Sequence, residues 1–330
     1  MACPVHNGRV RQLPSDQSDA AHAVRELLAR RSRFAVPGAP AAPDVDVVLR
    51  TSGSTANAKA VGHTFEAVRW AARTSREVLG DDGWRWLLML SPFATGGFMT
   101  VARSLPEPLI WPGLGGPFDA AAFTDWYPGG ARATALVSTH LARLLSAPAG
   151  VRFLQDLDVV LVGGGPLPPV LREGCAAHGI RAVATYGATE TLGGCVYDGL
   201  PWPGVEVSLI DGQIHLDGPN LSPGYVPGPA IPRPWPTGDV GRWHDGRLQV
   251  LGRTDDQVTV KGVNRRLRDY ETDAMAHPGV LEAVAVAVPD PVDGYRVEVF
   301  VEDAEHRLPR LENGKPDRQE LLRRASGQRR

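Results

Sequence analysis

Three short runs of apolar, mostly β-branched residues each lead directly into a loop of small residues. The runs and the loops that follow them are 44–50 with 51–55, 158–162 with 163–165, and 182–185 with 186–190. Such runs are typical of strands buried on both faces, and helical patterns lie between them. This order predicts an α/β fold, a large layered domain in which ligands bind beyond the carboxyl ends of the strands.

The hydrophobic period changes to two near residue 204. Apolar residues alternate over 205–209 and again over 214–216, on either side of an Asp211-Gly212 turn, which predicts an antiparallel hairpin. We therefore expect an N-terminal domain over 1–254, with α/β layers over 44–203 and an antiparallel β subdomain over 204–251. A helix, two strands and a last helix then predict a small α+β C-terminal domain over 255–330.

Charge and cysteine content exclude several classes of function. The 35 Lys and Arg against 37 Asp and Glu give a net charge of -2, so the overall charge does not indicate binding to nucleic acid or to an anionic membrane. Three widely spaced cysteines indicate neither a disulfide framework nor a zinc site. No apolar run approaches the ~18 residues of a membrane span, and the first ten residues do not read as a signal peptide. We expect a cytoplasmic protein, with its oligomeric state, a homodimer included, left open.

The first of the three loops has the parts of a polyphosphate site. It consists of Thr51, Ser52, Gly53, Ser54 and Thr55, followed by Lys59 and then by a helical pattern. Backbone N–H groups, hydroxyls, one cation and a nearby helix start all favour an anion. The loop does not fit the common triphosphatase pattern GxxxxGK[ST]. A plain turn is the alternative, since clusters of Ser, Thr and Gly are frequent in turns.

Three further segments have residues suited to a nucleotide. Residues 186–190 place an aromatic face, a glycine, a hydroxyl and a carboxylate directly after a strand, as stacking on a base and holding Mg²⁺ require. Asp239, beside Gly238, has a carboxylate suited to ribose hydroxyls, although Asp-Gly is also a common turn. Lys315 stands on a tip bounded by Gly314 and Pro316, where it is either a mobile cation or an ordinary solvated lysine.

Taken together and in order, these segments resemble the signature set of the AMP-forming acyl and aryl adenylating enzymes. The matching segments are 51–55 with Lys59, 163–165, 186–190, 237–239, 252–256, 261–262 and 313–315, within residues 44–318. In that family a carboxylate attacks the α-phosphate of ATP to give an acyl-adenylate, and a thiol then displaces AMP. The resemblance implies ATP, Mg²⁺ and an acceptor thiol, and a mobile C-terminal lid domain.

The resemblance also implies a role for each matched residue. The 52–59 loop would hold the β- and γ-phosphates, Gly163, Gly164 and Gly165 would pack on the adenine and the acid, and Tyr186, followed by Gly187, would stack on the adenine. Asp239 and Arg253 would bind the ribose, Thr189 would contact the α-phosphate, and Glu190 would hold Mg²⁺. Asp255 matches the hinge, Lys315 the lysine that neutralises charge on the α-phosphate, and Lys261 with Gly262 the lining of the thiol tunnel.

A narrower resemblance concerns residues 185–199, with Pro201, Gly204 and Val205. This stretch is similar to that of short actinobacterial o-succinylbenzoate-CoA ligases of menaquinone biosynthesis, which also have only about 50 residues before the phosphate loop. The resemblance implies o-succinylbenzoate as the acid and coenzyme A as the acceptor. Candidate residues of the acid pocket are Phe93, Gly97, His140, Gly193 and Gly194.

The sequence departs from the family pattern at a few positions. Ala56, Ala58 and Ala60 replace two glycines and a proline of the phosphate loop, and Phe93 replaces a histidine near the acid pocket. Two alternatives therefore stay open: an adenylating enzyme for another acid, loading coenzyme A or a carrier protein, and a nucleotide-binding homologue that has lost catalysis. Because Lys59, Glu190 and Lys315 are all retained, the second alternative is the weaker.

Overall fold

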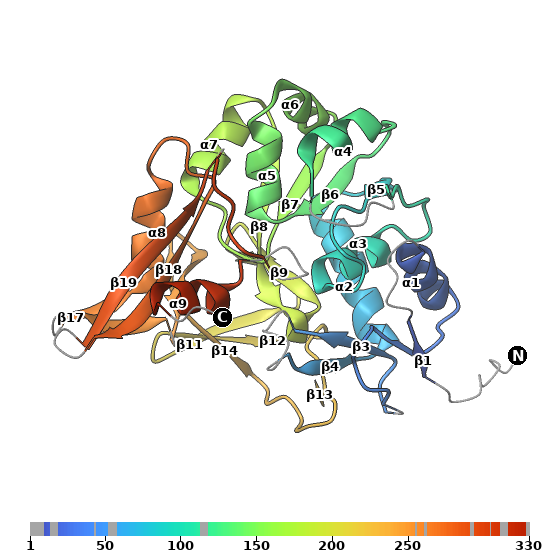
Figure 1. Cartoon of the computed structure of the whole chain (residues 1–330). Coiled ribbons are helices and arrows are strands. Elements are labelled where there is room, and N and C mark those ends of the chain that lie inside the picture. Colours follow the sequence, from blue (N-terminus) through green and yellow to red (C-terminus); the bar gives the residue numbers. More distant parts are fainter. Residues whose placement is uncertain are drawn as a thin grey trace, which may run out of the picture.

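The computed structural model describes residues 10–13, 19–42, 44–51, 58–112, 118–254, 256–260, 263–290, 294–303, 305–310 and 316–327. Within these residues the strands form four sheets, and helices cover them in layers (Figure 1). This arrangement confirms the predicted α/β fold class. No helix in the described ranges has both the length and the apolarity that a membrane crossing requires.

The first sheet holds the strands that flank the candidate phosphate loop. Its order is β1 (Arg11–Gln12), β2 (Phe34–Ala35), β3 (Val47–Arg50), β4 (Ala60–His63) and β13 (Gly224–Tyr225). Val47, Val48 and Leu49 are fully buried, as their continuous apolar run predicts. β4 is antiparallel to both β3 and β13.

The second sheet is parallel over four strands and supplies the carboxyl edge that the sequence predicts. Its order is β10 (Leu200–Pro201), β9 (Gly193–Tyr197), β8 (Ala182–Ala188), β7 (Val159–Val162), β6 (Ala133–Leu136) and β5 (Trp86–Leu87). The parallel pairs are β5–β6, β6–β7 and β7–β8, and β9 is antiparallel to β8 and β10.

Each face of this sheet packs against its own set of helices. One core cluster joins Val159 and Leu161 to α1 (Ala20–Ala29), α2 (Phe65–Leu79) and α3 (Thr95–Arg103). A second cluster joins Val160 and Val162 to the other face, whose helices are α4 (Ala120–Trp126), α5 (Ser138–Leu145), α6 (Pro148–Gln155) and α7 (Pro169–Ala177). Alternate residues of β7 thus enter opposite cores, which explains why its sequence is continuously apolar.

Helix α2 shows how local sequence sets its own limits. The Thr64 hydroxyl accepts the N–H of Ala67 at 3.1 Å, and Gly80 ends the helix with a left-handed φ of 79°. Thr64 and Gly80 thus fix the two ends of the helix.

The third sheet contains the predicted hairpin at Asp211-Gly212 and a second one at Asp245-Gly246. Its order is β11 (Glu206–Ile210), β12 (Gln213–Asp217), β14 (Trp235–His244) and β15 (Arg247–Arg253). Both turns, Asp211-Gly212 and Asp245-Gly246, have positive φ at both residues, as tight antiparallel turns favour. The chain between β12 and β14 differs from expectation, because it leaves this sheet and its strand β13 joins the first sheet beside β4.

The C-terminal residues form a fourth sheet of β17 (Val263–Arg266), β16 (Gln257–Val260), β19 (Gly294–Glu302) and β18 (Glu282–Asp290), with α8 (Leu267–Met275) and α9 (Arg318–Ala325). Leu321 of α9 packs with Val284, Val286 and Phe300 in a small core of its own. In Figure 1 these elements, orange to red, lie beside α5.

Candidate active site

Lys59 lies at the base of a β-hairpin, opposite Thr51. The Thr51 N–H donates to the Lys59 carbonyl at 2.8 Å, and the Lys59 N–H donates to Thr51 Oγ1 at 2.9 Å. Ala60 then pairs with Arg50 in the antiparallel β3–β4 ladder. The helix expected after Lys59 is present as α2 and begins at Phe65, but the intervening residues 60–63 form a strand that the sequence did not reveal.

Several predicted residues gather at the carboxyl edge of the second sheet. His140 lies in the first turn of α5 after β6, Gly163 to Gly165 follow β7, and Thr189 with Glu190 follow β8. Gly163 faces the next strand closely, because a Cβ there would lie 2.5 Å from Thr185 Oγ1, whereas Gly164 and Gly165 are exposed. This is the edge at which open α/β sheets bind ligands.

The segment around Tyr186 differs from the predicted loop. β8 continues through Tyr186 and Gly187 to Ala188, pairs with β9 as far as Gly193, and turns through the 3₁₀ helix η1 (Thr189–Thr191). A Cβ at Gly187 would overlap the carbonyl oxygen of Gly193. The small residues that resemble a loop in the sequence instead allow two strands to approach closely.

Tyr186, Asp239 and Arg253 are brought together. The Tyr186 hydroxyl donates to Asp239 Oδ2 at 2.8 Å, and it also lies 3.1 Å from Thr237 Oγ1. Asp239 of β14 pairs with Arg253 of β15, whose NH1 donates to Asp239 Oδ1 at 3.5 Å. Burial and the nearby Asp239 charge raise the pKa of Tyr186, so its phenol remains a donor.

Glu190 is buried, with 7% of its surface exposed, and both its backbone carbonyl and its side chain accept hydrogen bonds. Its carbonyl accepts the N–H of Ser222 at 2.8 Å, and its Oε1 accepts the Tyr225 hydroxyl at 3.1 Å. The Lys59 ammonium lies 4.7 Å from the centre of the Tyr225 ring. Tyr225 therefore contacts both Lys59 and Glu190. The sequence did not point to Tyr225, because residues 224 and 225 match none of the motifs described above.

Thr189 and the predicted acid pocket meet the start of α3. The Thr189 and Thr95 hydroxyl oxygens are 2.9 Å apart. Gly193, with a φ of 84°, lies near Thr95, and Gly194 lies against Thr185. Two other predicted pocket residues have a packing reason for their identity. Phe93 packs on the first core cluster, and a Cβ at Gly97 would overlap the backbone of Ser91.

His140 contacts the other core. Its ring stacks on Phe118 at 4.2 Å between centroids, and its buried Nδ1 finds no hydrogen-bond partner in the described ranges. Burial, with the charges of Arg143 and Arg310, lowers the pKa of His140 to about 3, so the ring is neutral near pH 7. No hydrogen bond or ring contact joins His140 to Phe93 in the part of the chain that the structure describes.

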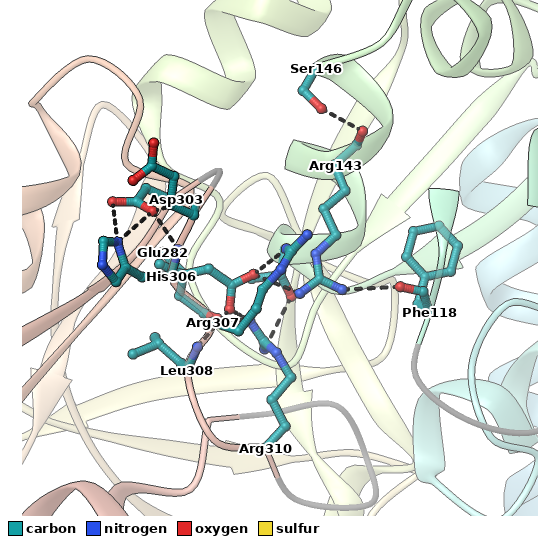
Figure 2. Close-up of polar contacts among 12 residues, drawn as sticks. Phe118, Arg143, Ser146, Glu282, Asp303, His306, Arg307, Leu308 and Arg310 are labelled. Atoms are coloured by element: carbon teal, nitrogen blue, oxygen red, sulfur yellow. Dashed lines mark hydrogen bonds and ion pairs between the residues drawn. The ribbon is translucent and has the colours of Figure 1, made fainter. Parts of the chain in front are cut away.

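An ionic cluster that the sequence did not reveal joins α5 to the C-terminal sheet (Figure 2). Arg143 NH2 donates to Glu302 Oε1 at 2.6 Å, and Arg310 NH2 donates to Glu302 Oε2 at 2.6 Å and to Glu282 Oε2 at 2.7 Å. Arg310 also reaches Thr139 at 3.5 Å. The partners are far apart in sequence, so no spacing pattern could reveal the cluster.

Eight predicted site residues lie outside the described residues: Ser52, Gly53, Ser54, Thr55, Asp255, Lys261, Gly262 and Lys315. Arg310 and Pro316, on either side of the segment with Lys315, form an isolated antiparallel bridge. Because Arg310 contacts Thr139, this bridge lies near the start of α5.

The described residues suit Mg²⁺ better than a metal with many protein ligands. No group of three or more His, Cys, Asp or Glu side chains gathers as a metal site within the described ranges. Mg²⁺ is commonly held by one or two carboxylates together with substrate phosphates, which Glu190 could satisfy. Cys195 is fully buried and burial raises its pKa to about 11, as expected for a packed, unreactive thiol.

Comparisons with known proteins agree with this geometry. The family model described as AMP-binding enzyme matches residues 5–226. A relative from Mycobacterium tuberculosis (strain CDC 1551 / Oshkosh), named probable 2-succinylbenzoate–CoA ligase, is 34% identical over 272 residues, which are 77% of this chain and 70% of the relative.

Two solved structures show the same fold. A variant of MenE from Escherichia coli with bound OSB-AMS has a TM-score of 0.72 at 24% identity, over 93% of this chain and 80% of that one. O-succinylbenzoate coenzyme A synthetase (MenE) from Bacillus subtilis, in complex with ATP and magnesium ion, has a TM-score of 0.66 at 24% identity, over 78% and 60%. With a family match over more than half of its length, the chain belongs to the AMP-binding enzyme family.

Proposed function

We propose that this protein is an ATP- and Mg²⁺-dependent acid–thiol ligase that converts o-succinylbenzoate and coenzyme A into o-succinylbenzoyl-CoA. One observation carries the proposal: two groups of predicted nucleotide contacts meet at the end of a single strand. Tyr186 of β8 holds Asp239, and Glu190, just after β8, is joined through Tyr225 to Lys59. The relative from M. tuberculosis supports the identity of the acid.

In the first half-reaction a carboxylate oxygen of the acid attacks the α-phosphorus of ATP, and pyrophosphate leaves. The Tyr186 ring stacks on the adenine, with Gly163 to Gly165 beside it. The Asp239 carboxylate accepts hydrogen bonds from the two ribose hydroxyls. The Tyr186 hydroxyl and Arg253 set the orientation of this carboxylate. These contacts hold the α-phosphorus in line with the acid, and such positioning lowers the barrier substantially.

Charge on the phosphates is met by groups from several segments. Thr189 donates to the α-phosphate, and Lys59 with residues 52–55 holds the β- and γ-phosphates. Bound Mg²⁺, held by Glu190, supplies positive charge to the phosphate oxygens. Lys315 neutralises charge that develops on the α-phosphate, as preorganised cations do in other acyl and phosphoryl transfers.

In the second half-reaction the coenzyme A thiol attacks the carbonyl carbon of the acyl-adenylate, and AMP leaves. The domain after about residue 254 rotates about Asp255, and Lys261 and Gly262 then line the path of the thiol. This rotation would break the contacts of Arg143 with Glu302 and of Arg310 with Thr139, which join that domain to α5.

The acid pocket is formed by Phe93, Gly97, His140, Gly193 and Gly194. O-succinylbenzoate has two carboxylates, and only one becomes the adenylate, so the other requires a compensating charge. Because His140 is neutral, it cannot supply that charge. Arg143, three residues further along α5, is already paired with the buried Glu302 at 2.6 Å, so it does not supply that charge while this contact is formed.

The direct test is pyrophosphate release with ATP and Mg²⁺ across a panel of acids, with and without coenzyme A, and with the thioester followed by mass spectrometry. Formation of o-succinylbenzoyl-CoA supports the proposal. Turnover with another acid alone would assign the chain to a different adenylating reaction, and ATP binding without turnover would indicate an impaired homologue. We further propose a cytoplasmic location, since the three widely spaced cysteines suit a reducing compartment.

A further inference from the structure

The segment between β12 and β14 ties strand β4, which follows Lys59, to the turn that contains Glu190. Ser222, in this segment, donates its N–H to the Glu190 carbonyl at 2.8 Å and its hydroxyl to the Gly62 carbonyl at 2.6 Å. Asn220 donates from Nδ2 to the Thr191 carbonyl at 2.8 Å. Asn220 and Ser222 are both 1% exposed, so these bonds are shielded from water and hold the two segments at a fixed separation.

The register of β13 on β4 places Tyr225 beside Lys59. Tyr225 pairs with Val61, and the Val226 N–H donates to the carbonyl of Ala60, the residue after Lys59, at 2.9 Å. The side chain of Lys59 reaches back over the phenol, with its ammonium 4.7 Å from the ring centre. A cation at this distance from an aromatic face is attracted to it without being neutralised.

The hydroxyl end of the same ring faces Glu190. It donates to Glu190 Oε1 at 3.1 Å, and the carboxylate is almost fully buried. This geometry makes the Tyr225 hydroxyl a donor to Glu190.

Tyr225 contacts two opposite charges. The Lys59 ammonium lies 4.7 Å from its ring centre and Glu190 accepts its hydroxyl, so we expect the ammonium and the carboxylate to approach each other more freely when the ring is removed. In a direct ion pair Lys59 and Glu190 would neutralise each other, so that neither charge would be available to phosphate or to Mg²⁺.

We propose that Tyr225 is a positioning residue for the adenylation step, a spacer that holds the Lys59 ammonium and the Glu190 carboxylate apart and oriented before MgATP binds. The proposal rests on the roles assigned to Lys59 and Glu190 under the proposed function. It concerns binding geometry, and Tyr225 itself contacts neither substrate nor metal in this account.

Two variants separate the contributions of the hydroxyl and the ring. Tyr225→Phe keeps the ring over which Lys59 lies and removes only the donor to Glu190. Tyr225→Leu removes both. Tyr127→Phe is the matched control, because the Tyr127 hydroxyl also has one hydrogen bond, from the Ala131 N–H at 3.0 Å, and the residue packs in the second core cluster.

The readout is ATP affinity by calorimetry, with Mg²⁺ varied and with EDTA present. Tyr225→Phe should leave Mg²⁺-free ATP affinity unchanged and raise the Mg²⁺ concentration needed for tight binding about tenfold, as expected for the loss of a hydrogen bond to a charged group. Tyr225→Leu should also weaken Mg²⁺-free ATP several-fold. In Glu190→Gln the Phe substitution should have no further effect on Mg²⁺ dependence.

Three results would overturn the proposal. They are an unchanged Mg²⁺ requirement in Tyr225→Phe, equal losses with and without Mg²⁺, and additive effects of Tyr225→Phe and Glu190→Gln. Equal loss would indicate a merely structural role, and the thermal melt of each variant beside Tyr127→Phe checks that reading independently. A wild-type protein that binds MgATP but makes no thioester would contradict the proposed function and leave this test intact.

Discussion

Arg143 of α5 and Glu302 at the end of β19 form a 2.6 Å ion pair, although 159 positions separate them in the sequence. Glu302 is fully buried and also accepts from Arg307 and Arg310 (Figure 2). Burial alone would raise the pKa of Glu302, but the hydrogen bonds and charges of Arg143 and Arg310 lower it to about 2. The contact between α5 and the C-terminal sheet therefore depends on an ionised carboxylate.

We expect this carboxylate to stabilise the fold only where it is charged. Because its folded pKa lies below the unfolded value near 4.5, its contribution is complete above that pH and is lost as the pH falls toward 2. Glu302→Gln should reduce the free energy of unfolding by about 3 kcal/mol at pH 7, since it leaves buried guanidinium groups uncompensated.

Urea denaturation of both proteins between pH 3 and pH 7 checks this expectation. Glu305→Gln, an exposed change in the same segment, is the control and should be neutral. A deficit for Glu302→Gln that stays constant down to pH 3 would show that the charge of Glu302 is not what matters.

The buried histidines predict a second loss of stability in mild acid. Burial lowers the pKa of His140 to about 3 and that of His63 to about 4. The backbone of Thr189 raises the pKa of His63, but by less than burial lowers it. The unfolded chain therefore binds more protons than the folded one below pH 6.5, so stability falls as the pH drops from 6.5 toward 4.

His140→Phe should keep the stacking on Phe118 and remove one titrating group. The slope of unfolding free energy against pH between 6 and 4 should then decrease by about 1.4 kcal/mol per pH unit, the value for one proton. Chemical denaturation at several pH values measures the slope, and an unchanged slope would mean that His140 can be protonated in the folded protein.

The close approach of β8 and β9 predicts that Gly187 tolerates no side chain. Gly187→Ala would force its Cβ onto the Gly193 carbonyl and displace the turn that contains Glu190. We expect a destabilisation of about 2 kcal/mol, typical of overpacking, together with weaker MgATP binding. Gly174→Ala in α7 is the control, because a Cβ at Gly174 would meet only the Leu145 side chain at 3.6 Å, an ordinary contact. Equal behaviour of the two variants in thermal melts and calorimetry would contradict the assignment.

The pair of Tyr186 and Asp239 predicts recognition of the ribose. Asp239→Ala should raise the KM for ATP about 10- to 100-fold, since hydrogen bonds to a charged group are lost. It should also remove the preference for ATP over 2′-deoxy-ATP, whereas Tyr186→Phe should weaken that preference only in part. Steady-state kinetics with both nucleotides decide the matter, and a preference retained in Asp239→Ala would place the ribose contact elsewhere.

The sequence predicted those parts of the fold that depend on neighbouring residues. The helix after Lys59 and the hairpin at Asp211-Gly212 follow from periodicity and turn chemistry within a few positions. Strand β4 was missed because its four residues, 60–63, become a strand only through pairing with β3. The same holds for β13, which is two residues long and pairs with β4 across more than 160 positions.

Prediction of the site had the same limit. Asp239 and Arg253 were expected near the nucleotide from a resemblance in sequence order, and their contact arises from the β14–β15 register. Tyr225 was not expected, because its significance depends on Lys59 and Glu190, which lie far from it in the chain. Arg143 and Glu302 were missed for the same reason.

The central claim is tested most directly by incubating the purified protein with o-succinylbenzoate, ATP, Mg²⁺ and coenzyme A and measuring the products by mass spectrometry. We predict o-succinylbenzoyl-CoA, AMP and pyrophosphate in equal amounts, and pyrophosphate with enzyme-bound acyl-adenylate when coenzyme A is omitted. The absence of both the adenylate and the thioester, in a preparation shown to bind MgATP, would contradict the account.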